Sequence, residues 1–238
     1  MADKGTDQQK RRFKLTEELV KRVHRDLEDP GYDPTTAVFS EKDYDDHLQE
    51  FLSEKPAGPL HVFAYGSLIW KPAFNPAAML PGKAQGWRRS FCLRITRFRG
   101  TAQQPGLMMA LDKGGTCEGF VQQLQEGREH EDLQKLWRRE MTMKPPTNHP
   151  RWIEVKLENS NVQAIAFTAN PERPNYAADF SMEEIADTLS IACGHWGSGA
   201  DYLHQTVNAL EAAGIHDPYL WHLQELVAER ITARCETL

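Results

Sequence analysis

An acidic side chain falls on the apolar side of a predicted helix. Residues 129–144 read EHEDLQKLWRREMTMK, and Leu133, Leu136 and Trp137 recur at helical spacing. Continuing this stripe by three or four residues reaches Glu140, which we therefore place toward the core. Apolar surroundings raise the pKa of a carboxylate, and such a group can serve as a general base. The alternative is a stripe that frays near its end, or an ion pair with Arg97, Arg99, Arg138 or Arg139.

A short apolar run is interrupted by two small residues. Residues 62–70 read VFAYGSLIW, in which an apolar strand stops at Gly66 and Ser67. A glycine permits a turn that other residues resist, and successive backbone N–H groups then form a nest for an anion such as a carboxylate. The Ser67 hydroxyl adds one more donor. An ordinary turn at a strand end is the competing interpretation.

Other motifs carry less information. Arg97 and Arg99 lie in a stretch that joins two apolar strands, and this stretch is either a polar hairpin or a loop that contacts a substrate. Ser67 is not in a G-x-S-x-G nucleophile elbow, and the chain has no G-x-x-x-x-G-K-[ST] phosphate loop. Cys193 and His195 have the spacing of a ligand pair without partners, so we predict no metal site.

Composition excludes several classes of function. The chain has 238 residues, 40% of them hydrophobic, and a net charge of −6, whereas nucleic-acid binders usually carry a clustered basic face. No stretch approaches the roughly 20 apolar residues of a membrane helix, and the N-terminus has no segment of signal-peptide type. The four cysteines are widely separated, which fits free thiols in a reducing compartment. We therefore expect a cytoplasmic protein that binds neither nucleic acid nor membrane.

The elements that must position these residues follow from local patterns. Residues 1–12 are polar and expected to be disordered. Helices are predicted over 14–28, 41–53, 129–143, 182–192, 200–213 and 217–233. Strands are predicted over 61–65, 84–97, 106–112, 117–124, 151–157 and 161–168.

The order of these elements indicates the fold class. A run of strands with helices before and after it is typical of an α+β fold, and strands this short and numerous can close into a barrel. The proline- and glycine-rich linker 55–59 divides the chain. We predict an N-terminal helical extension over 1–58 and the main domain over 59–238.

Taken together and in this order, the motifs resemble the ChaC family of γ-glutamylcyclotransferases over about 60 to 210. The stretch VFAYGSLIW resembles a family segment that contains Tyr-Gly-Ser-Leu. The segments that follow are GWRRSFCLR (86–94), RGTAQQPGLMMAL (99–111), CEGFVQQL (117–124), LWRREM (136–141) and GSGADYL (197–203). The resemblance implies a small mixed β-barrel with flanking helices.

The resemblance also implies a reaction without cofactor or metal. In this family, the α-amine of the γ-glutamyl group of glutathione attacks the γ-carbonyl, and the products are 5-oxoproline and Cys-Gly. Glu140 then corresponds to the proton acceptor of the family. The expected substrate-binding residues are Val62, Phe63, Ala64, Tyr65, Gly66, Ser67 and Leu68, together with Arg97 and Tyr202. The sequence gives no indication of the oligomeric state.

The sequence departs from the family pattern at two places. Ala64 replaces a common glycine, and the proline-rich stretch 142–150 after Glu140 is longer than usual. Another γ-glutamyl peptide or a γ-glutamylamine is therefore the alternative substrate. Two other functions compete: a non-catalytic relative that binds a γ-glutamyl compound, and a hydrolase with Ser67 or Cys117 as nucleophile. Product analysis separates these functions. A cyclotransferase yields 5-oxoproline, a hydrolase yields free glutamate, and a non-catalytic relative yields no product.

Overall fold

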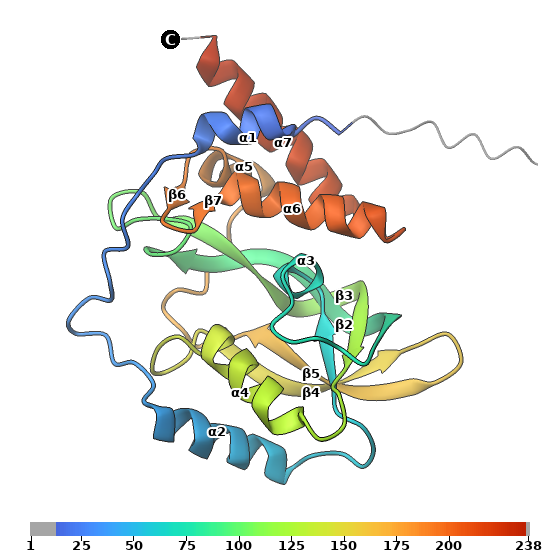
Figure 1. Ribbon diagram of the computed structural model, residues 1–238. Coiled ribbons are helices and arrows are strands. Elements are labelled where there is room, and N and C mark those ends of the chain that lie inside the picture. Colours follow the sequence, from blue (N-terminus) through green and yellow to red (C-terminus); the bar gives the residue numbers. More distant parts are fainter. Residues whose placement is uncertain (1–12, 237–238) are drawn as a thin grey trace, which may run out of the picture.

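A closed barrel of five strands forms the centre of the molecule (Figure 1). The computed structural model describes residues 13–236. The strand order is β1-β3-β2-β4-β5, and a parallel pairing of β1 with β5 closes the barrel, while the pairs β1–β3, β2–β3 and β4–β5 are antiparallel. The predicted small mixed barrel of an α+β fold is thus confirmed. The strands are β1 His61–Ala64, β2 Ala78–Ile95, β3 Gly106–Gln123, β4 Asn148–Lys156 and β5 Asn161–Ala169.

The strands β2 and β3 make one long, bent hairpin. The prediction of separate strands over 106–112 and 117–124 is wrong, because β3 runs unbroken through Gly114 and Gly115. These two glycines have φ values of 105° and 68° and lie where the pairing register shifts, opposite Gly86. The irregularity is a β-bulge, which bends a strand without ending it.

The short strand β1 is buried on both of its sides. Val62 and Ala64 join one apolar cluster, and Phe63 joins another. Successive side chains of a strand point to opposite faces, so a strand packed on both faces is an uninterrupted apolar run. After Tyr65 and Gly66 the chain forms the short helix α3, Ser67–Trp70.

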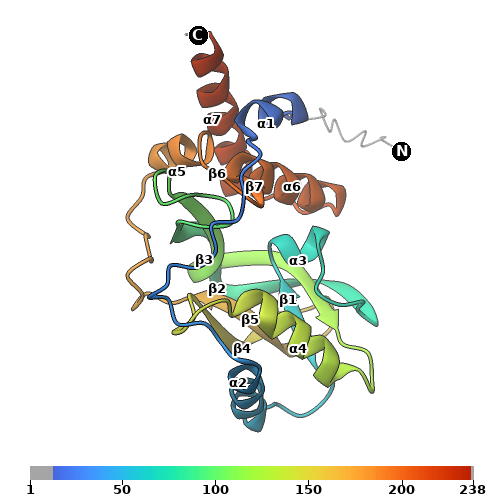
Figure 2. The ribbon, with the colours of Figure 1, turned by 60° about the vertical axis from the view of Figure 1, so that its left-hand side comes forward.

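Helices cover the two ends of the barrel, as two views agree (Figures 1 and 2). At one end lie α1 Glu17–Val23, α5 Met182–Leu189, α6 Gly199–Ala212 and α7 Pro218–Cys235. At the other end lie α2 Glu41–Ser53 and α4 Glu129–Glu140. The two-residue strands β6 Cys193–Gly194 and β7 Gly197–Ser198 pair beside α6.

Three helices are shorter than predicted, and one of them, expected over 182–192, ends at Leu189. The first was expected over 14–28 but spans Glu17–Val23, with Thr16 as its N-cap. Leu27, the last member of the predicted stripe, is 39% exposed, so extending the helix to it would bury little apolar surface. The helix expected over 129–143 ends at Glu140.

The N-terminal segment contributes to the same core as the barrel. Helix α1 packs on α6 and α7, and α2 packs on α4. Leu15 and Leu48 are fully buried in the cluster that also contains Val62 and Trp137. The boundary between 1–58 and 59–238 stays a prediction, and residues 1–12 lie outside the described part. Among residues 13–236, no helix is long and apolar enough to cross a membrane.

Candidate active site

A pocket of about 390 Å³ opens between α3, the end of α4, the β2–β3 hairpin and α6. Of the residues expected to form a site, those that line it are Tyr65, Gly66, Ser67, Leu68, Glu140 and Tyr202. The buried strand residues Val62, Phe63 and Ala64 lie behind this lining, in the barrel wall. Arg97 is not among the lining residues. The structure thus brings together most of the residues expected from the sequence.

Glu140 is the last residue of α4 and lies at the pocket wall. The stripe that leads to it is fully buried, since Leu133, Leu136 and Trp137 are 0% exposed. One Glu140 oxygen lies 3.4 Å from Nε of Arg139, and the other accepts a hydrogen bond of 3.3 Å from Asn148.

Burial dominates the ionisation of Glu140. Loss of solvent raises the pKa of the Glu140 carboxyl, while the Arg139 charge and the Asn148 hydrogen bond act in the opposite direction. Both interpretations of the sequence are therefore partly right: the carboxylate has an arginine neighbour, and its pKa is nevertheless raised. Such a group is suited to take up and return a proton.

The raised pKa predicts how stability depends on pH. Below the usual Glu value of 4.5, Glu140 is protonated in the folded and the unfolded chain. As pH rises from 4.5 through the higher folded-state pKa, the unfolded chain loses its proton first, so the wild type loses stability. Glu140→Gln has no proton to lose. We expect urea denaturation to show that the free energy of unfolding of Glu140→Gln increases relative to that of the wild type as pH rises through this window. A difference between the two free energies that does not grow with pH would contradict the raised pKa.

Gly66 lies where the chain leaves β1 and enters α3. Its backbone has φ −141° and ψ −128°, which is not the positive-φ range that favours glycine. Space is the constraint, because a Cβ at Gly66 would lie 2.8 Å from Cε of Met109 and 2.9 Å from Oη of Tyr202. The chain needs a glycine here because a side chain has no room beside the pocket.

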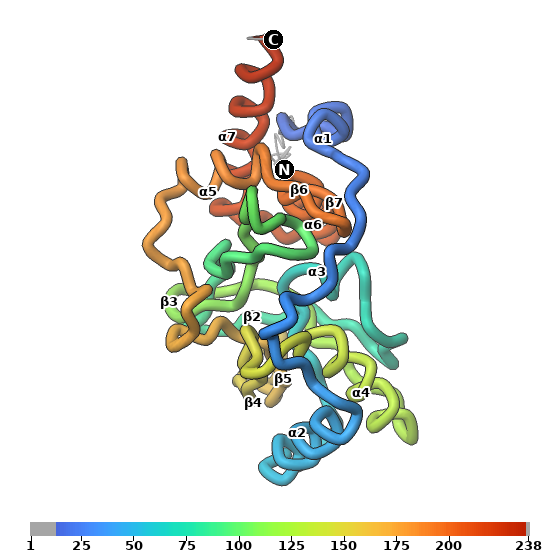
Figure 3. Tube along the Cα trace, turned by 90° about the vertical axis from the view of Figure 1, so that its left-hand side faces the viewer, coloured from blue at the N-terminus to red at the C-terminus, as the bar shows by residue number. Residues whose placement is uncertain are grey.

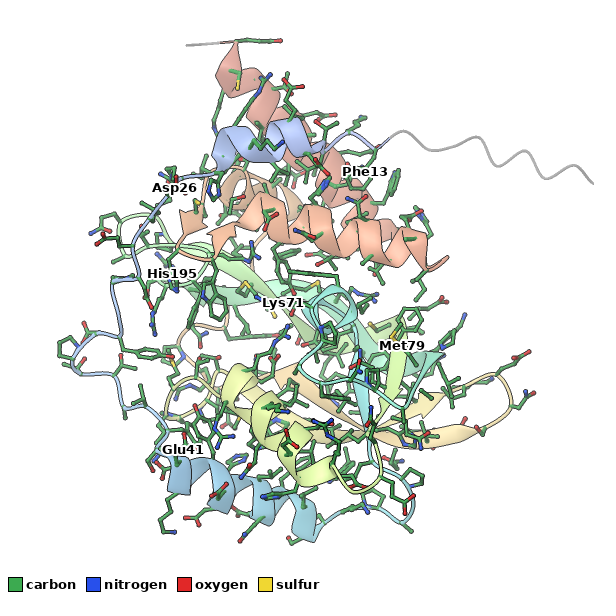
Figure 4. All side chains as sticks on the ribbon, viewed as in Figure 1. Phe13, Asp26, Glu41, Lys71, Met79 and His195 are labelled. Carbon is green, nitrogen blue, oxygen red and sulfur yellow. The ribbon has the colours of Figure 1, made fainter. Side chains whose placement is uncertain are left out.

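Ser67 begins α3 and connects two sides of the pocket. Its Oγ accepts a hydrogen bond of 2.8 Å from Nη2 of Arg139, whose Nη1 donates to the Lys71 carbonyl oxygen. Burial raises the pKa of the Tyr202 phenol, while hydrogen bonds from the Ser67 backbone N–H and hydroxyl act in the opposite direction. Lys71 marks the end of α3 in Figure 4.

The structure separates the two arginines of the 97–106 stretch. Arg99 lines the pocket and is 8% exposed, and its Nη1 donates 2.8 Å hydrogen bonds to the Ser198 carbonyl and to Asp201. Arg97 turns away and binds Asp29. Phe98 between them has a φ of 68°, so the two neighbours point to different surroundings. A sequence pattern does not reveal such a kink, and Arg97 was therefore chosen in place of Arg99.

Several pocket residues were not expected from the sequence. Arg139 was considered only as an ion-pair partner, and Asn148 only as part of a loop. Phe98, Trp196 and Met109 also line the pocket, and local patterns give no signal for them. Within residues 13–236, no group of three or more His, Cys, Asp or Glu side chains is arranged to hold a metal ion.

Comparison with known proteins identifies the family. A family model described as ChaC-like protein matches residues 60–230. The glutathione-specific γ-glutamylcyclotransferase of Escherichia coli (strain K12) is 38% identical over 161 residues, which cover 67% of this chain and 69% of the relative. The human glutathione-specific γ-glutamylcyclotransferase 1 is 27% identical over 183 residues, covering 75% of this chain and 82% of the relative.

A solved structure shows the same fold. The crystal structure of a γ-glutamylcyclotransferase specific to glutathione from yeast has a TM-score of 0.65 and 20% identity, covering 72% of this chain and 96% of that chain. The resemblance found in the sequence motifs is confirmed, since the family model spans well over half of the chain. The chain belongs to the ChaC-like family.

Proposed function

We propose that this protein is a γ-glutamylcyclotransferase that cleaves glutathione into 5-oxoproline and Cys-Gly. One observation carries the proposal: a carboxyl group of raised pKa, Glu140, lies in a pocket that also contains two guanidinium groups, those of Arg99 and Arg139. Glutathione has an α-ammonium group, which a base must deprotonate, and two carboxylates. The names of the E. coli and human relatives support the same substrate.

The two ends of the substrate have matching partners in the pocket. We assign the α-carboxylate of the glutamyl group to Ser67, the first-turn N–H groups of α3 and Arg139, whose Nη2 already donates to Ser67 Oγ. We assign the carboxylate of the leaving dipeptide to Arg99, because its hydrogen bonds within the described residues, 2.8 Å to the Ser198 carbonyl and to Asp201, both come from Nη1. Guanidinium groups suit carboxylates because both are planar and can form paired hydrogen bonds.

The proposed chemistry is an internal acyl transfer. Glu140 takes a proton from the α-ammonium, and the freed nitrogen attacks the γ-carbonyl carbon of the same glutamyl group. The attacking nitrogen gives up a second proton as the ring closes, and the C–N bond to the cysteine residue breaks. Glu140 returns the first proton to the departing amine, which takes up the second as it is released as an ammonium group. No water is consumed. Because the nucleophile is already tethered to the carbonyl, the pocket contributes mainly by holding the ring-closing geometry.

The observations disfavour a hydrolase. Burial raises the pKa of the Cys117 thiol to about 11, and Cys117 lies outside the pocket lining. Ser67 lines the pocket, but no histidine is among the lining residues within the described part of the chain, so Ser67 has no imidazole base there. A binding protein without activity would have no use for a poorly solvated carboxylate beside the substrate amine. A different γ-glutamyl substrate is the remaining alternative.

Product analysis tests the proposed function. The purified protein is incubated with glutathione, and the products are separated by chromatography. We expect 5-oxoproline and Cys-Gly in equal amounts, with no incorporation of ¹⁸O from labelled water. Free glutamate would indicate a hydrolase, and absence of any product would leave only a binding role. The same assay with other γ-glutamyl compounds determines the preferred substrate.

Asn148 is expected to set the pH range of activity. Its side chain donates to Glu140 and so favours the charged carboxylate. In Asn148→Ala this contribution is lost, which raises the pKa of Glu140 further. We expect the acidic limb of the pH profile of kcat/KM to move to higher pH. The rate should therefore fall more at low pH than at high pH. The matched control is Asn161→Ala, which changes an exposed asparagine at the start of β5. If the acidic limb of Asn148→Ala does not move, the limb does not report the ionisation of Glu140.

We extend the proposal to the compartment and the partner of the protein. Free thiols at all four cysteines support a reducing compartment such as the cytoplasm. The assigned partner is a small molecule.

A further inference from the structure

A long segment without regular secondary structure crosses one side of the molecule. Residues 24–40, here called the strap, connect α1 at one end of the barrel to α2 at the other (Figure 3). Only Tyr32, Thr36 and Phe39 within it are partly buried, and its other residues are exposed. Loops of this length in compact domains are uncommon unless they have a role. Since burial does not hold the strap in place, its specific contacts are informative.

The first set of contacts joins the strap to Arg97. The two carboxylate oxygens of Asp29 accept hydrogen bonds of 2.8 and 2.6 Å from Arg97, and this pair lowers the pKa of Asp29 to about 2. The Tyr32 ring lies 3.8 Å from the guanidinium carbon of the same arginine. His195 lies beside the strap as well, with Nδ1 3.6 Å from Asp29 (Figure 4). Arg97 is thus held on two sides by the strap.

Arg97 is followed directly by a wall of the pocket. Phe98 lines the pocket and has a φ of 68°, a conformation that bulky residues adopt only when their surroundings impose it. Its ring packs against the Trp196 ring with the centroids 4.3 Å apart and the planes tilted by 41°, and the Phe98 carbonyl oxygen accepts a hydrogen bond from the Trp196 backbone N–H. The strap fixes one side of Phe98 through Arg97, and Arg99 is fixed on the other side by Ser198.

A second set of contacts joins the strap to the opposite side of the pocket. The Ala37 carbonyl accepts a 2.7 Å hydrogen bond from the Lys144 N–H, and the two residues form an isolated β-bridge. Lys144 also pairs with Asp43 at the start of α2, and its Nζ lies 5.4 Å from the centre of the Phe39 ring. The loop that contains Lys144 contributes Thr142, Met143 and Thr147 to the pocket lining.

We propose that the strap is a specificity-determining part of the site: Asp29 and Tyr32, acting through Arg97, and Ala37, acting through Lys144, hold the two opposite walls of the pocket at a fixed spacing that fits a dipeptide leaving group. This inference rests on the proposed function. Asp29 and Tyr32 are positioning residues, because neither lines the pocket. The strap segment between the two sets of contacts, 33–36, acts as a tie of defined length.

Two variants test the proposal in different ways. In the double variant Asp29→Ala with Tyr32→Leu, the contacts to Arg97 are lost. In the second variant, Gly-Ser-Gly is inserted after Asp33, so that all contacts can form but the tie is longer. The matched controls are Asp187→Ala, which removes the surface ion pair with Arg230, and the same insertion after Asn159 in the exposed β4–β5 turn. Asp29→Glu retains the negative charge, so its KM for glutathione is expected to lie between the values of the wild type and the double variant.

The main measurement compares a long substrate with a short one. We expect both strap variants to raise KM for glutathione about tenfold, roughly the effect of losing 1.4 kcal/mol of binding, with kcat changed less than about twofold. For γ-glutamyl-alanine, which lacks the terminal glycine, KM is expected to change little. The ratio of kcat/KM values therefore falls for the strap variants and not for the controls. An unchanged ratio in folded variants, or a ratio changed equally in the controls, overturns the proposal.

Two measurements do not depend on turnover. Hydrogen exchange followed by mass spectrometry reports whether residues 95–104 and 141–147 are less protected in the strap variants, as we expect. Quenching of tryptophan fluorescence gives the affinities for glutathione and γ-glutamyl-alanine. If the wild type releases no 5-oxoproline from either compound, the proposed function has failed, and the binding ratio then decides the role of the strap alone. Unchanged protection together with an unchanged binding ratio rejects that role.

Discussion

Glu140→Gln is expected to abolish the formation of 5-oxoproline while glutathione still binds. The amide keeps the size of the carboxyl group and can still accept a hydrogen bond from Asn148, but it cannot take the proton of the substrate α-ammonium. Loss of a general base typically lowers the rate by a factor on the order of 10²–10⁴. Turnover is measured by chromatography of 5-oxoproline, and binding by quenching of tryptophan fluorescence, since Trp196 lines the pocket and is 54% exposed.

The matched control for this variant lies on the same helix. Glu131 is exposed and pairs with Arg128 and Lys135, so Glu131→Gln makes the same chemical change away from the pocket. It is expected to turn over glutathione like the wild type. Near-wild-type turnover by Glu140→Gln would exclude Glu140 as the base. A folded Glu140→Gln that no longer binds glutathione would assign the carboxylate to substrate binding instead.

The barrel was predictable because apolar stretches alternate with turn residues between about 60 and 168. The one misjudged break, at Gly114 and Gly115, shows the limit of this approach. Two adjacent glycines usually separate two elements, but here they lie in a β-bulge opposite Gly86, and the ladder with β2 continues on both sides of it. Whether a glycine pair ends a strand depends on the neighbouring strand, which a local pattern does not contain.

The candidate site was predictable where one element determines the position of a residue. The helical period places Glu140 on the side of α4 that is buried up to Trp137, whereas the resemblance alone implied its role as a base. Arg97 and Arg99 differ by two residues and would share a face in a regular strand. The left-handed conformation of Phe98 sends them to different surroundings, and contacts with distant residues impose it. Gly66 was expected for its backbone freedom, whereas in the structure its neighbours Met109 and Tyr202 leave no room for a side chain.

The strap was invisible in the sequence for a related reason. It has no period, little apolar character and few buried residues, so it looks like a linker between two predicted helices. Its contacts join Asp29 to Arg97 across 68 positions, and Ala37 to Lys144 across an even longer interval. Contacts between residues so far apart in the sequence become apparent only in the folded structure, where the strap runs past both walls of the pocket.

Gly66→Val is expected to impair both substrate binding and turnover. A Cβ at this position already lies closer to Cε of Met109 and Oη of Tyr202 than real Cβ atoms approach their neighbours, and valine adds two methyl groups. The Met109 side chain can bend away, but the rigid Tyr202 ring must move and take with it the hydrogen bonds to Ser67. Overpacking of this kind costs about 1–3 kcal/mol, so we expect kcat/KM for glutathione to fall by roughly tenfold to a hundredfold.

A graded series separates loss of space from loss of hydrogen bonding. Gly66→Ala introduces the smaller clash and is expected to have an intermediate kcat/KM, and adding Met109→Ala removes one of the two clashing atoms and is expected to restore part of the loss. Ser67→Ala leaves the space unchanged and loses the 2.8 Å hydrogen bond that Ser67 Oγ accepts from Arg139. We expect a smaller fall in kcat/KM than for Gly66→Val, because Arg139 keeps its hydrogen bond to the Lys71 carbonyl oxygen and no neighbour has to move. Steady-state kinetics on variants with native circular dichroism spectra measures all four. A folded Gly66→Val with the KM of the wild type would contradict this prediction. It would mean that no substrate lies beside Gly66 and that the glutamyl group binds elsewhere.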